Sequence, residues 1–333
     1  MNKPRAVFFG NRQDLLTHVY PESRVERLKA LADVHPVIVT KDNFDDLLPE
    51  LSEIDYIFST WGMPRLTPAQ IKQMSALKMV FYGAGTVKYF AEPFLQQGIR
   101  VVSAWAANGI PVAEFTVAQM TLAAKGYFGL ARRLGSEGAS AWQPTKARGN
   151  YEIEISILGA GMVGREVIRR LSYHRANILV FDPFLSALDA EKMGVTRVGL
   201  EEAFERGYVV SNHLANVPET ENMLRREHFM SMSKGSTFIN TGRGATVDEP
   251  GMIEALEARG DITALLDVAQ QEPPTEDSPL YQLNNVWLSP HIAGSIGREV
   301  VRMADFVLDE FEKELNGEAL LYEVMLEHLP TMA

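Results

Sequence analysis

The sequence contains no cysteine, and this absence excludes several kinds of site at once. Disulfide bonds, thiolate nucleophiles, zinc–thiolate sites and iron–sulfur clusters all need cysteine. Redox chemistry in this protein would therefore need an external cofactor. Histidines outside the motifs described below show no ligand spacing, so we also expect no metal site.

Long apolar runs and excess basic charge are missing as well. No stretch reaches the roughly 18 uncharged apolar residues that a membrane helix needs, and the first apolar run, Ala6–Gly10, is too short for the core of a signal peptide. With 32 Lys and Arg against 43 Asp and Glu, the net charge is −11. Such a charge repels nucleic acids and anionic lipid surfaces. We expect a cytoplasmic protein that binds neither nucleic acid nor membrane.

What is present is an α/β pattern in a chain long enough for two domains. The 333 residues exceed the roughly 150 residues of one average domain. Short apolar runs alternate with helical stretches through residues 1–104, which predicts a parallel sheet. The predicted strands are Ala6–Phe9, Val37–Val39, Asp55–Ser59, Met79–Tyr82 and Arg100–Ser103, and the predicted helices are Glu22–Ala32 and Thr67–Met74.

A long apolar helix is predicted next. Pro111 suits the first turn of a helix, and the run from there to about Leu134 has few polar positions on any face. Such a helix is either internal to a core or packed between domains or against a second subunit. Its place between two α/β regions favours packing between domains or against a second subunit. A second series of strands and helices runs from 151 to about 290, and a last helix follows from about 297 to 315.

A glycine motif in the second series points to a dinucleotide. The predicted strand Ile153–Leu158 leads into Gly159-Ala160-Gly161-Met162-Val163-Gly164 and then into the helical Arg165–Leu171. The first glycine permits the tight turn, the second lets the backbone approach a pyrophosphate, and the third lets helix and strand pack closely. Asp182 ends the next predicted strand, where a carboxylate accepts hydrogen bonds from ribose hydroxyls and repels a 2′-phosphate. These residues favour NAD(H) over NADP(H), although a glycine turn in a sheet protein without cofactor has the same pattern.

Three further residues could supply the chemistry of hydride transfer to a carbonyl. The reaction needs a proton donor, a cation that holds the substrate oxygens, and a partner for the donor. His291, Arg243 and Glu272 each follow a predicted strand, and the carboxyl ends of parallel strands meet at one edge of a sheet. The alternatives without a chemical role are a histidine that caps a loop, an arginine in a surface ion pair and a solvated glutamate.

These motifs resemble the D-isomer-specific 2-hydroxyacid dehydrogenase family, and the matches run in family order across nearly the whole chain. The segments that carry the resemblance are the glycine motif, Asn108–Glu114, Ser211–Leu214, Pro218–Thr220, Phe238–Asp248, Leu266–Pro273, Ser278–Leu280 and Asn285–Gly294.

The resemblance implies a doubly wound Rossmann domain for NAD, residues 106–297. It is inserted into a smaller flavodoxin-like substrate domain, residues 1–105 with 298–333. It further implies that Arg243 binds the substrate carboxylate and carbonyl, that His291 is the acid/base, and that Glu272 bonds to it. The backbone of the loop Gly83-Ala84-Gly85 would meet the substrate carboxylate. The implied cofactor contacts are Gly159, Gly161, Met162, Val163, Gly164, Asp182, His213, Thr241, Asp267 and Gly294. No metal site is expected. The family resemblance also implies a homodimer through residues 111–134.

One departure concerns the substrate. Where phosphoglycerate dehydrogenases usually carry an arginine after the third strand, this chain has Trp61, which cannot pair with a phosphate. Trp61, Met63 and Tyr82 together suggest an apolar pocket edge, while Arg65 and Lys88 offer alternative cations nearby. The prediction is an NAD-dependent enzyme that interconverts a 2-keto acid and its D-2-hydroxy acid. Its alternatives are a non-catalytic NAD(H)-sensing binding protein and a dehydrogenase for a phosphorylated substrate such as 3-phosphoglycerate.

Overall fold

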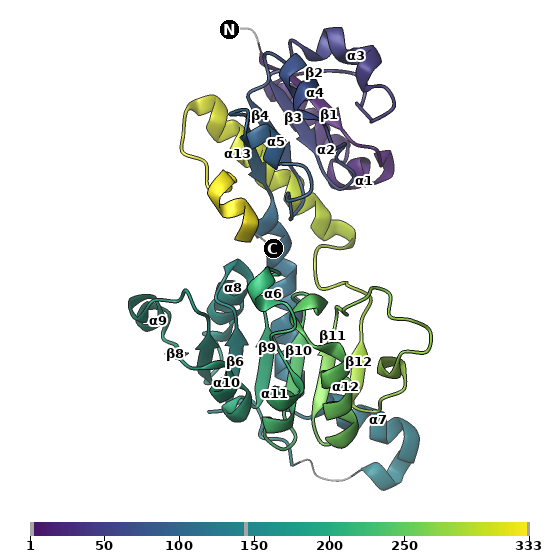
Figure 1. Cartoon of the computed structure of the whole chain (residues 1–333), viewed down its shortest axis with the longest axis vertical. Coiled ribbons are helices and arrows are strands. Elements are labelled where there is room, and N and C mark those ends of the chain that lie inside the picture. The colour runs from purple at the N-terminus through teal and green to yellow at the C-terminus, as the bar shows by residue number, and fades with distance from the viewer. Residues whose placement is uncertain (1–2, 143–145, 332–333) are drawn as a thin grey trace. The chain divides into compact units, whose positions relative to one another are not determined.

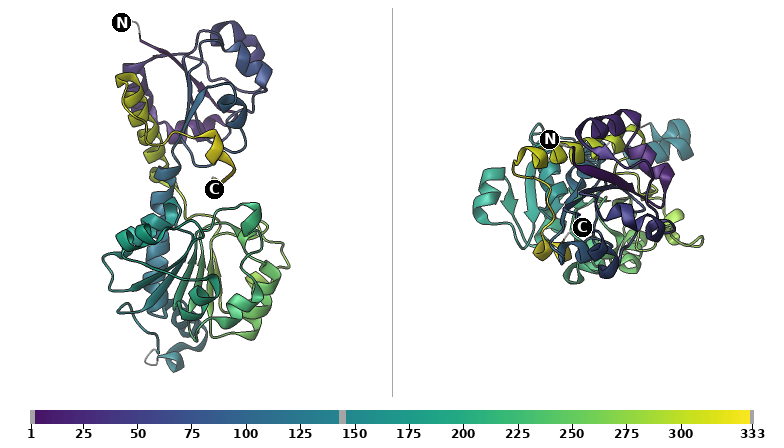
Figure 2. Two further views of the ribbon diagram at one scale, coloured as in Figure 1. Left: turned by 60° about the vertical axis from the view of Figure 1, so that its left-hand side comes forward. Right: turned by 90° about the horizontal axis from the view of Figure 1, so that it is seen from above.

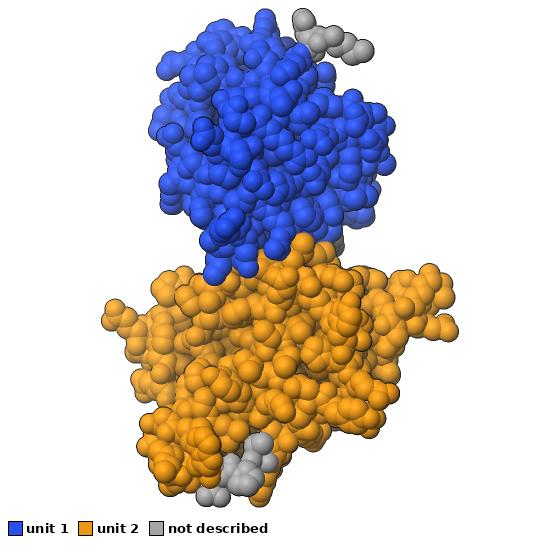
Figure 3. Space-filling model, turned by 180° about the vertical axis from the view of Figure 1, so that it is seen from behind, with its two compact units in different colours: residues 1–108, 295–332 blue, residues 109–294, 333 orange. Residues whose placement is uncertain are grey.

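A computed structural model describes residues 3–142 and 146–331 of the chain. The chain forms two compact units, residues 1–108 with 295–332 and residues 109–294 (Figure 3). The second unit is thus an insertion into the first. No helix in the described ranges has both the length and the apolar character to cross a membrane.

The smaller unit is built on a five-stranded parallel sheet in the order β2-β1-β3-β4-β5. This is the flavodoxin-like order. All residues of β3 and β4 are buried, as expected of parallel strands with helices on both faces. The strands are β1 (Arg5–Phe9), β2 (Asp33–Val34), β3 (Tyr56–Ser59), β4 (Met79–Tyr82) and β5 (Arg100–Ser103), and the helices are α1 (Gln13–Val19), α2 (Glu22–Leu31), α3 (Phe44–Leu51), α4 (Pro68–Gln73), α5 (Glu92–Leu95) and α13 (Val301–Asn316).

Aromatic packing joins the C-terminal helix to this sheet. Phe58 and Phe81 stack at 5.0 Å between ring centroids, and Phe311 of α13 meets both edge-on at 5.2 and 5.3 Å. An ion pair between Arg24 of α2 and Asp305 of α13 joins these two helices. The residues after 295 therefore belong to the same core as the N-terminal strands (Figure 2).

The larger unit has a seven-stranded parallel sheet in the order β12-β11-β10-β9-β6-β7-β8. Counted from β6, this is the doubly wound Rossmann order with one added strand, and the direction of winding switches between β6 and β9. Its strands are β6 (Glu154–Leu158), β7 (Asn177–Phe181), β8 (Thr196–Arg197), β9 (Val209–Asn212), β10 (Thr237–Asn240), β11 (Thr263–Leu266) and β12 (Val286–Leu288), and the helices labelled in Figure 1 are α6 (Trp105–Ala124), α7 (Tyr127–Glu137), α8 (Met162–Leu171), α9 (Ala187–Met193), α10 (Leu200–Arg206), α11 (Arg226–Ser231) and α12 (Glu249–Ala258).

Two predictions about local structure were wrong. The second strand is Asp33–Val34, and of the predicted Val37–Val39 only Val39 pairs, as an isolated bridge to Phe9. Between them Pro36 cannot donate to a ladder, and the His35 ring accepts from the Val37 amide at 3.2 Å, which forms a local turn. The apolar pattern alone could not show this turn.

The long helix starts earlier than predicted and is two helices. α6 begins at Trp105, so that Pro111 lies inside it, and it ends at Ala124. Gly126 then takes a left-handed conformation at φ 68°, which glycine adopts at little cost, and α7 begins after it. Leu122 on α6 remains 40% exposed, and the dimer through residues 111–134 stays a prediction.

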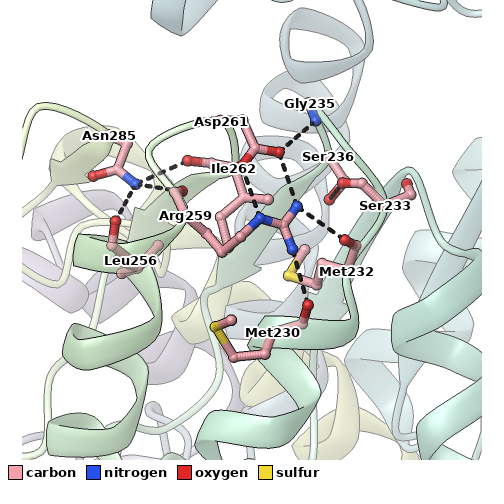
Figure 4. Close-up of polar contacts among 10 residues, drawn as sticks. All are labelled: Met230, Met232, Ser233, Gly235, Ser236, Leu256, Arg259, Asp261, Ile262 and Asn285. Carbon is pink, nitrogen blue, oxygen red and sulfur yellow. Dashed lines mark hydrogen bonds and ion pairs between the residues drawn. The ribbon is translucent and has the colours of Figure 1, made fainter.

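A polar clamp ties the amino ends of the last strands of the larger unit (Figure 4). Arg259 donates to the carbonyls of Met230 and Met232 and pairs with Asp261, and this hydrogen bond lowers the pKa of the Asp261 carboxyl. The Asn285 amide donates to three carbonyls, including that of Ile262 at 3.0 Å. Because these residues precede β11 and β12 in the chain, the clamp fixes the end of the sheet opposite to the candidate site described next.

Candidate functional site

The glycine motif forms a tight strand-to-helix turn between β6 and α8. Gly159 has φ 94°, and a Cβ there would lie 2.6 Å from the carbonyl oxygen of His213. A Cβ on Gly164 would lie 2.0 Å from the carbonyl oxygen of Gly159. At Gly161, in contrast, a Cβ would meet nothing within 4 Å. Two glycines are thus required by the fold itself, and only Gly161 faces open space.

That open space lies at the start of α8, a ten-residue helix. The first backbone bond of the helix runs from the Arg165 amide to the Gly161 carbonyl, 2.9 Å. The N–H groups of Met162, Val163 and Gly164 precede it and have no partner one turn back in the helix. The Met162 side chain points elsewhere, against Gly109 of α6. Backbone donors at a helix N-terminus beside open space fit the pyrophosphate of a dinucleotide.

A carboxylate stands beside this turn. Asp182, after β7, accepts from the Ala160 amide at 2.6 Å through Oδ2 and from the Phe184 amide at 2.7 Å through Oδ1. Arg165 donates to the Ala160 carbonyl at 2.8 Å, so the peptide groups before and after Ala160 are both held. This geometry suits a carboxylate that receives ribose hydroxyls.

His213, after β9, lies on the other side of the glycine turn. Its Nε2 is 2.9 Å from the Ser211 hydroxyl, while its Nδ1 is buried and has no hydrogen-bond partner among the residues that the structure describes. Burial lowers the pKa of His213 to about 4, so the ring is neutral at pH 7. A buried ring nitrogen without a partner fits a position where a bound molecule supplies one.

Arg243 follows β10 in a hydrogen-bonded turn. Its Nη1 donates to the Gly242 carbonyl at 2.8 Å, and within residues 3–142 and 146–331 no carboxylate forms an ion pair with it. Burial lowers the pKa of the guanidinium and the nearby negative Glu272 raises it; an arginine stays charged in either case. A partly buried cation with free N–H groups can receive a carboxylate.

His291 and Glu272 form a hydrogen-bonded pair. The His291 Nδ1 is 2.6 Å from Glu272 Oε2, and both side chains are accessible, at 51% and 38%. His291 has φ 54°, unusual for a residue with a side chain, and its amide donates to the carbonyls of Asp267 and Ser289. Because Nδ1 is occupied by Glu272, Nε2 is the nitrogen left to exchange a proton with a substrate.

Asp267 holds this loop in place. Its carboxylate, 2% exposed, accepts from the Ser289 hydroxyl at 2.5 Å and from the amides of Ile292 and Ala293 at 2.9 and 2.8 Å. The sequence offered no signal for the contribution of Ser289. Gly294 ends the larger unit just after this loop.

In the smaller unit, the free polar groups of the loop Gly83-Ala84-Gly85 are backbone amides. The Gly83 carbonyl accepts from the Thr60 hydroxyl at 2.8 Å, and the carbonyls of Ala84 and Gly85 accept from the Ser103 hydroxyl at 3.0 and 2.5 Å. Across the described residues, the amides of Ala84 and Gly85 donate no hydrogen bond. Fixed carbonyls and free amides suit a loop that binds an anionic oxygen.

The predicted apolar pocket edge needs a correction. Met63 and Tyr82 are core residues, 3% and 1% exposed, and the Tyr82 hydroxyl bonds to that of Tyr89 at 3.1 Å. Of the three residues, only Trp61 is partly accessible. Arg65 lies over the Tyr89 ring, 5.7 Å from its centroid.

The larger unit brings together Arg243, Glu272 and His291 after β10, β11 and β12, which are neighbours in the sheet. Sequence reasoning missed Thr116 of α6, a buried residue whose hydroxyl lies 2.8 Å from that of Thr241. Throughout the described ranges, no group of three or more His, Asp or Glu side chains could hold a metal ion.

A doubly wound sheet with a glycine turn at its switch point and an acid at the end of the next strand defines a dinucleotide-binding domain. Residues 117–293 match the model of the D-isomer specific 2-hydroxyacid dehydrogenase, NAD binding domain. The chain belongs to this family, as its motifs predicted.

Relatives and solved structures agree with this membership. The chain is 28% identical over 320 residues to a D-3-phosphoglycerate dehydrogenase of Methanocaldococcus jannaschii, covering 95% of this chain and 60% of the relative. It is 37% identical over 227 residues to that of Archaeoglobus fulgidus, covering 67% and 42%. The chain thus spans 60% or less of the length of these two relatives. A phosphoglycerate oxidoreductase from Rhizobium etli matches with a TM-score of 0.82 at 27% identity, over 96% of this chain and 97% of that one.

Proposed function

We propose that this protein is an NAD-dependent oxidoreductase that interconverts a 2-keto acid and its D-2-hydroxy acid. The observation that carries the proposal is the 2.6 Å pair of His291 and Glu272. These residues follow β12 and β11, the two strands that come next in the sheet after β10, the strand that Arg243 follows. A proton donor with its carboxylate partner beside a cation is the set of groups that carbonyl reduction needs.

Each residue has a distinct task in this proposal. Arg243 keeps Nη1 on the Gly242 carbonyl and offers its remaining N–H groups to the substrate carboxylate and carbonyl oxygen. His291 gives a proton from Nε2 to the oxygen as it becomes an alkoxide, and takes it back in the reverse reaction. Glu272 holds the ring by Nδ1 and keeps Nε2 turned toward the substrate.

The cofactor site is proposed to run along the glycine turn. The amides that open α8 would hold the pyrophosphate, and Asp182 the adenosine ribose. His213, Thr241, Asp267 and Gly294 are the further contacts expected from the family. NAD(H) supplies or accepts the hydride when bound, and Asp182 favours it over NADP(H).

The smaller unit is proposed to be the substrate domain. The free amides of Ala84 and Gly85 would bind the substrate carboxylate. Trp61 would limit the size of the substituent that the keto acid carries. The alternative is a phosphorylated substrate, because several relatives are named D-3-phosphoglycerate dehydrogenase. Arg65, which lies over the Tyr89 ring, is a cation in the same unit. The dimer and the cytoplasmic location stay predictions.

The test is the loss of NADH absorbance with a panel of 2-keto acids: glyoxylate, hydroxypyruvate, pyruvate, branched and aromatic keto acids, and phosphohydroxypyruvate. We expect turnover of at least one of them, and slower turnover with NADPH. Competition by inorganic phosphate would identify a phosphorylated substrate. Detectable NADH binding without turnover of any member would contradict the proposal and favour an NAD(H)-sensing binding protein.

A further inference from the structure

We propose that Asn212, Asn240 and Thr246 form a buried bracket that positions Arg243 for substrate. This inference rests on the proposed function, because it assigns these three residues to the binding of the keto acid. They do not touch the substrate; they act through the backbone of Arg243.

The bracket is built by the register of two strands. Asn212 ends β9 and Asn240 ends β10, and the two are directly paired across the sheet. Their side chains are 0% and 1% exposed, and Thr246 in the following 3₁₀ turn is 0% exposed. Burying three polar side chains is unfavourable unless each finds partners, so the partners show what the bracket does.

The three side chains bond first to one another. The Asn212 amide nitrogen donates to Asn240 Oδ1 at 3.1 Å and to Thr246 Oγ1 at 2.8 Å. Asn212 Oδ1 accepts from the Leu214 amide at 3.2 Å. Both hydrogens and the oxygen of this amide are therefore used, which fixes its orientation.

The same side chains then hold the backbone around Arg243. In the Thr241–Gly242 peptide, Asn240 Oδ1 accepts from the Gly242 amide at 3.1 Å. In the Arg243–Gly244 peptide, the Arg243 carbonyl accepts from Thr246 Oγ1 at 2.8 Å and from Asn240 Nδ2 at 3.3 Å. Because these two peptides are held, the backbone between them, from which the Arg243 side chain leaves, has little freedom to turn.

The backbone packs closely on both sides of Arg243, at Gly242 and at Gly244. A Cβ on Gly242 would lie 3.0 Å from the Asn212 carbonyl oxygen, and a Cβ on Gly244 would lie 1.9 Å from that of Ala269. Ala269 belongs to the segment that leads to Glu272. A shift of the Arg243 turn would thus also disturb the approach to the His291–Glu272 pair.

The test compares Thr246→Val with Thr246→Ser. Valine keeps the shape of threonine but loses the hydroxyl, whereas serine keeps the bond to the Arg243 carbonyl. For Thr246→Val we expect the KM of the best keto acid to rise about tenfold, with weaker inhibition by oxamate in the same proportion and an unchanged Kd for NADH. For Thr246→Ser we expect values close to the wild type.

Ser156→Ala is the matched control. Its hydroxyl is also 0% exposed and donates to a backbone carbonyl, that of Ala203, at 2.7 Å. We expect it to lower the unfolding midpoint as Thr246→Val does but to leave the KM unchanged. If Thr246→Val does not fold, Thr246→Ala takes its place.

Hydrogen exchange of the free protein gives a readout that does not depend on turnover. We expect faster exchange in residues 241–245 for Thr246→Val and no change there for Ser156→Ala. Equal KM values and equal exchange for the valine and serine variants would overturn the bracket. An equal rise in KM for Ser156→Ala would do the same. A wild-type protein that turns over no keto acid would instead refute the proposed function, and the exchange rates would still decide on the bracket.

Discussion

The two units offer different chemistry at the carboxyl ends of their sheets. In the larger unit these ends carry charged side chains, Arg243, Glu272 and His291, and behind Arg243 lies a buried network of amides and hydroxyls. In the smaller unit, hydroxyls of Thr60 and Ser103 hold a loop whose free groups are backbone amides. In the proposed function, the larger unit performs the chemistry and the backbone amides of the smaller unit bind the substrate carboxylate.

The largest effect is expected in the larger unit, at the proton donor. His291→Gln removes the group that exchanges the proton, and we expect kcat to fall about 10²–10⁴-fold. The Kd for NADH, measured by fluorescence titration, should stay nearly unchanged. A loss of NADH affinity as large as the fall in kcat would show that His291 supports the cofactor site. It would contradict the role of His291 as the proton donor.

A pair of glycine variants separates folding from cofactor binding. Gly164→Ala places a Cβ against the Gly159 carbonyl, so we expect it to destabilise the free protein by about 1–3 kcal/mol. Gly161→Ala places its Cβ in open space, so the free protein should keep its unfolding midpoint while NADH affinity falls. Thermal unfolding with and without NADH measures both. Equal destabilisation of the free protein by the two variants would contradict the open space at Gly161.

The stability of the protein in acid depends on His213 of the larger unit, a partly accessible residue whose ring nitrogen Nδ1 is buried. Burial lowers the pKa of His213 to about 4, below the ordinary value near 6.5. Protonation therefore favours the unfolded chain, and this contribution to stability is complete above pH 6.5 and is lost as the pH falls toward 4. Between about pH 7.5 and 5, the free energy of unfolding in urea should therefore fall for both proteins. We expect the fall to be about 1–2 kcal/mol smaller for His213→Gln than for the wild type. The same loss in both proteins would mean that His213 is not buried in this way.

The smallest effect is expected in the smaller unit. Ser103→Ala removes the hydroxyl that donates to the carbonyls of Ala84 and Gly85 in the loop proposed to bind the substrate carboxylate. The KM of the keto acid should therefore rise about two- to fivefold, with kcat little changed. Steady-state kinetics on the preferred keto acid gives both constants. A loss of kcat as large as that of His291→Gln would place chemistry in the smaller unit and break the comparison.

The sequence predicted the parts of this arrangement that depend on local pattern. Met79–Tyr82 is a strand with the predicted bounds, because a buried parallel strand appears as an unbroken apolar run. Arg100–Ser103 is also a strand, as predicted, with Val101 and Val102 at its centre. The strand β2 was misplaced because its two residues are selected by pairing with β1. The break in the long helix depends on one left-handed glycine, Gly126.

The charged groups of the site were predictable because each follows an apolar strand within a recognisable motif. The bracket behind Arg243 was not. Asn212 and Asn240 are 28 residues apart, and they meet only because β9 and β10 pair in one register. Met63 and Tyr82 were misjudged for a related reason, since their burial depends on which loops cover the sheet.

The most direct test of the account is the reduction of NAD⁺ by the two pure enantiomers of the 2-hydroxy acid that corresponds to the best keto acid of the panel. The account predicts that the D enantiomer reduces NAD⁺, that the L enantiomer does not, and that His291→Gln abolishes the D-dependent signal. Reduction by the L enantiomer alone, or by neither while NADH still binds, would contradict it.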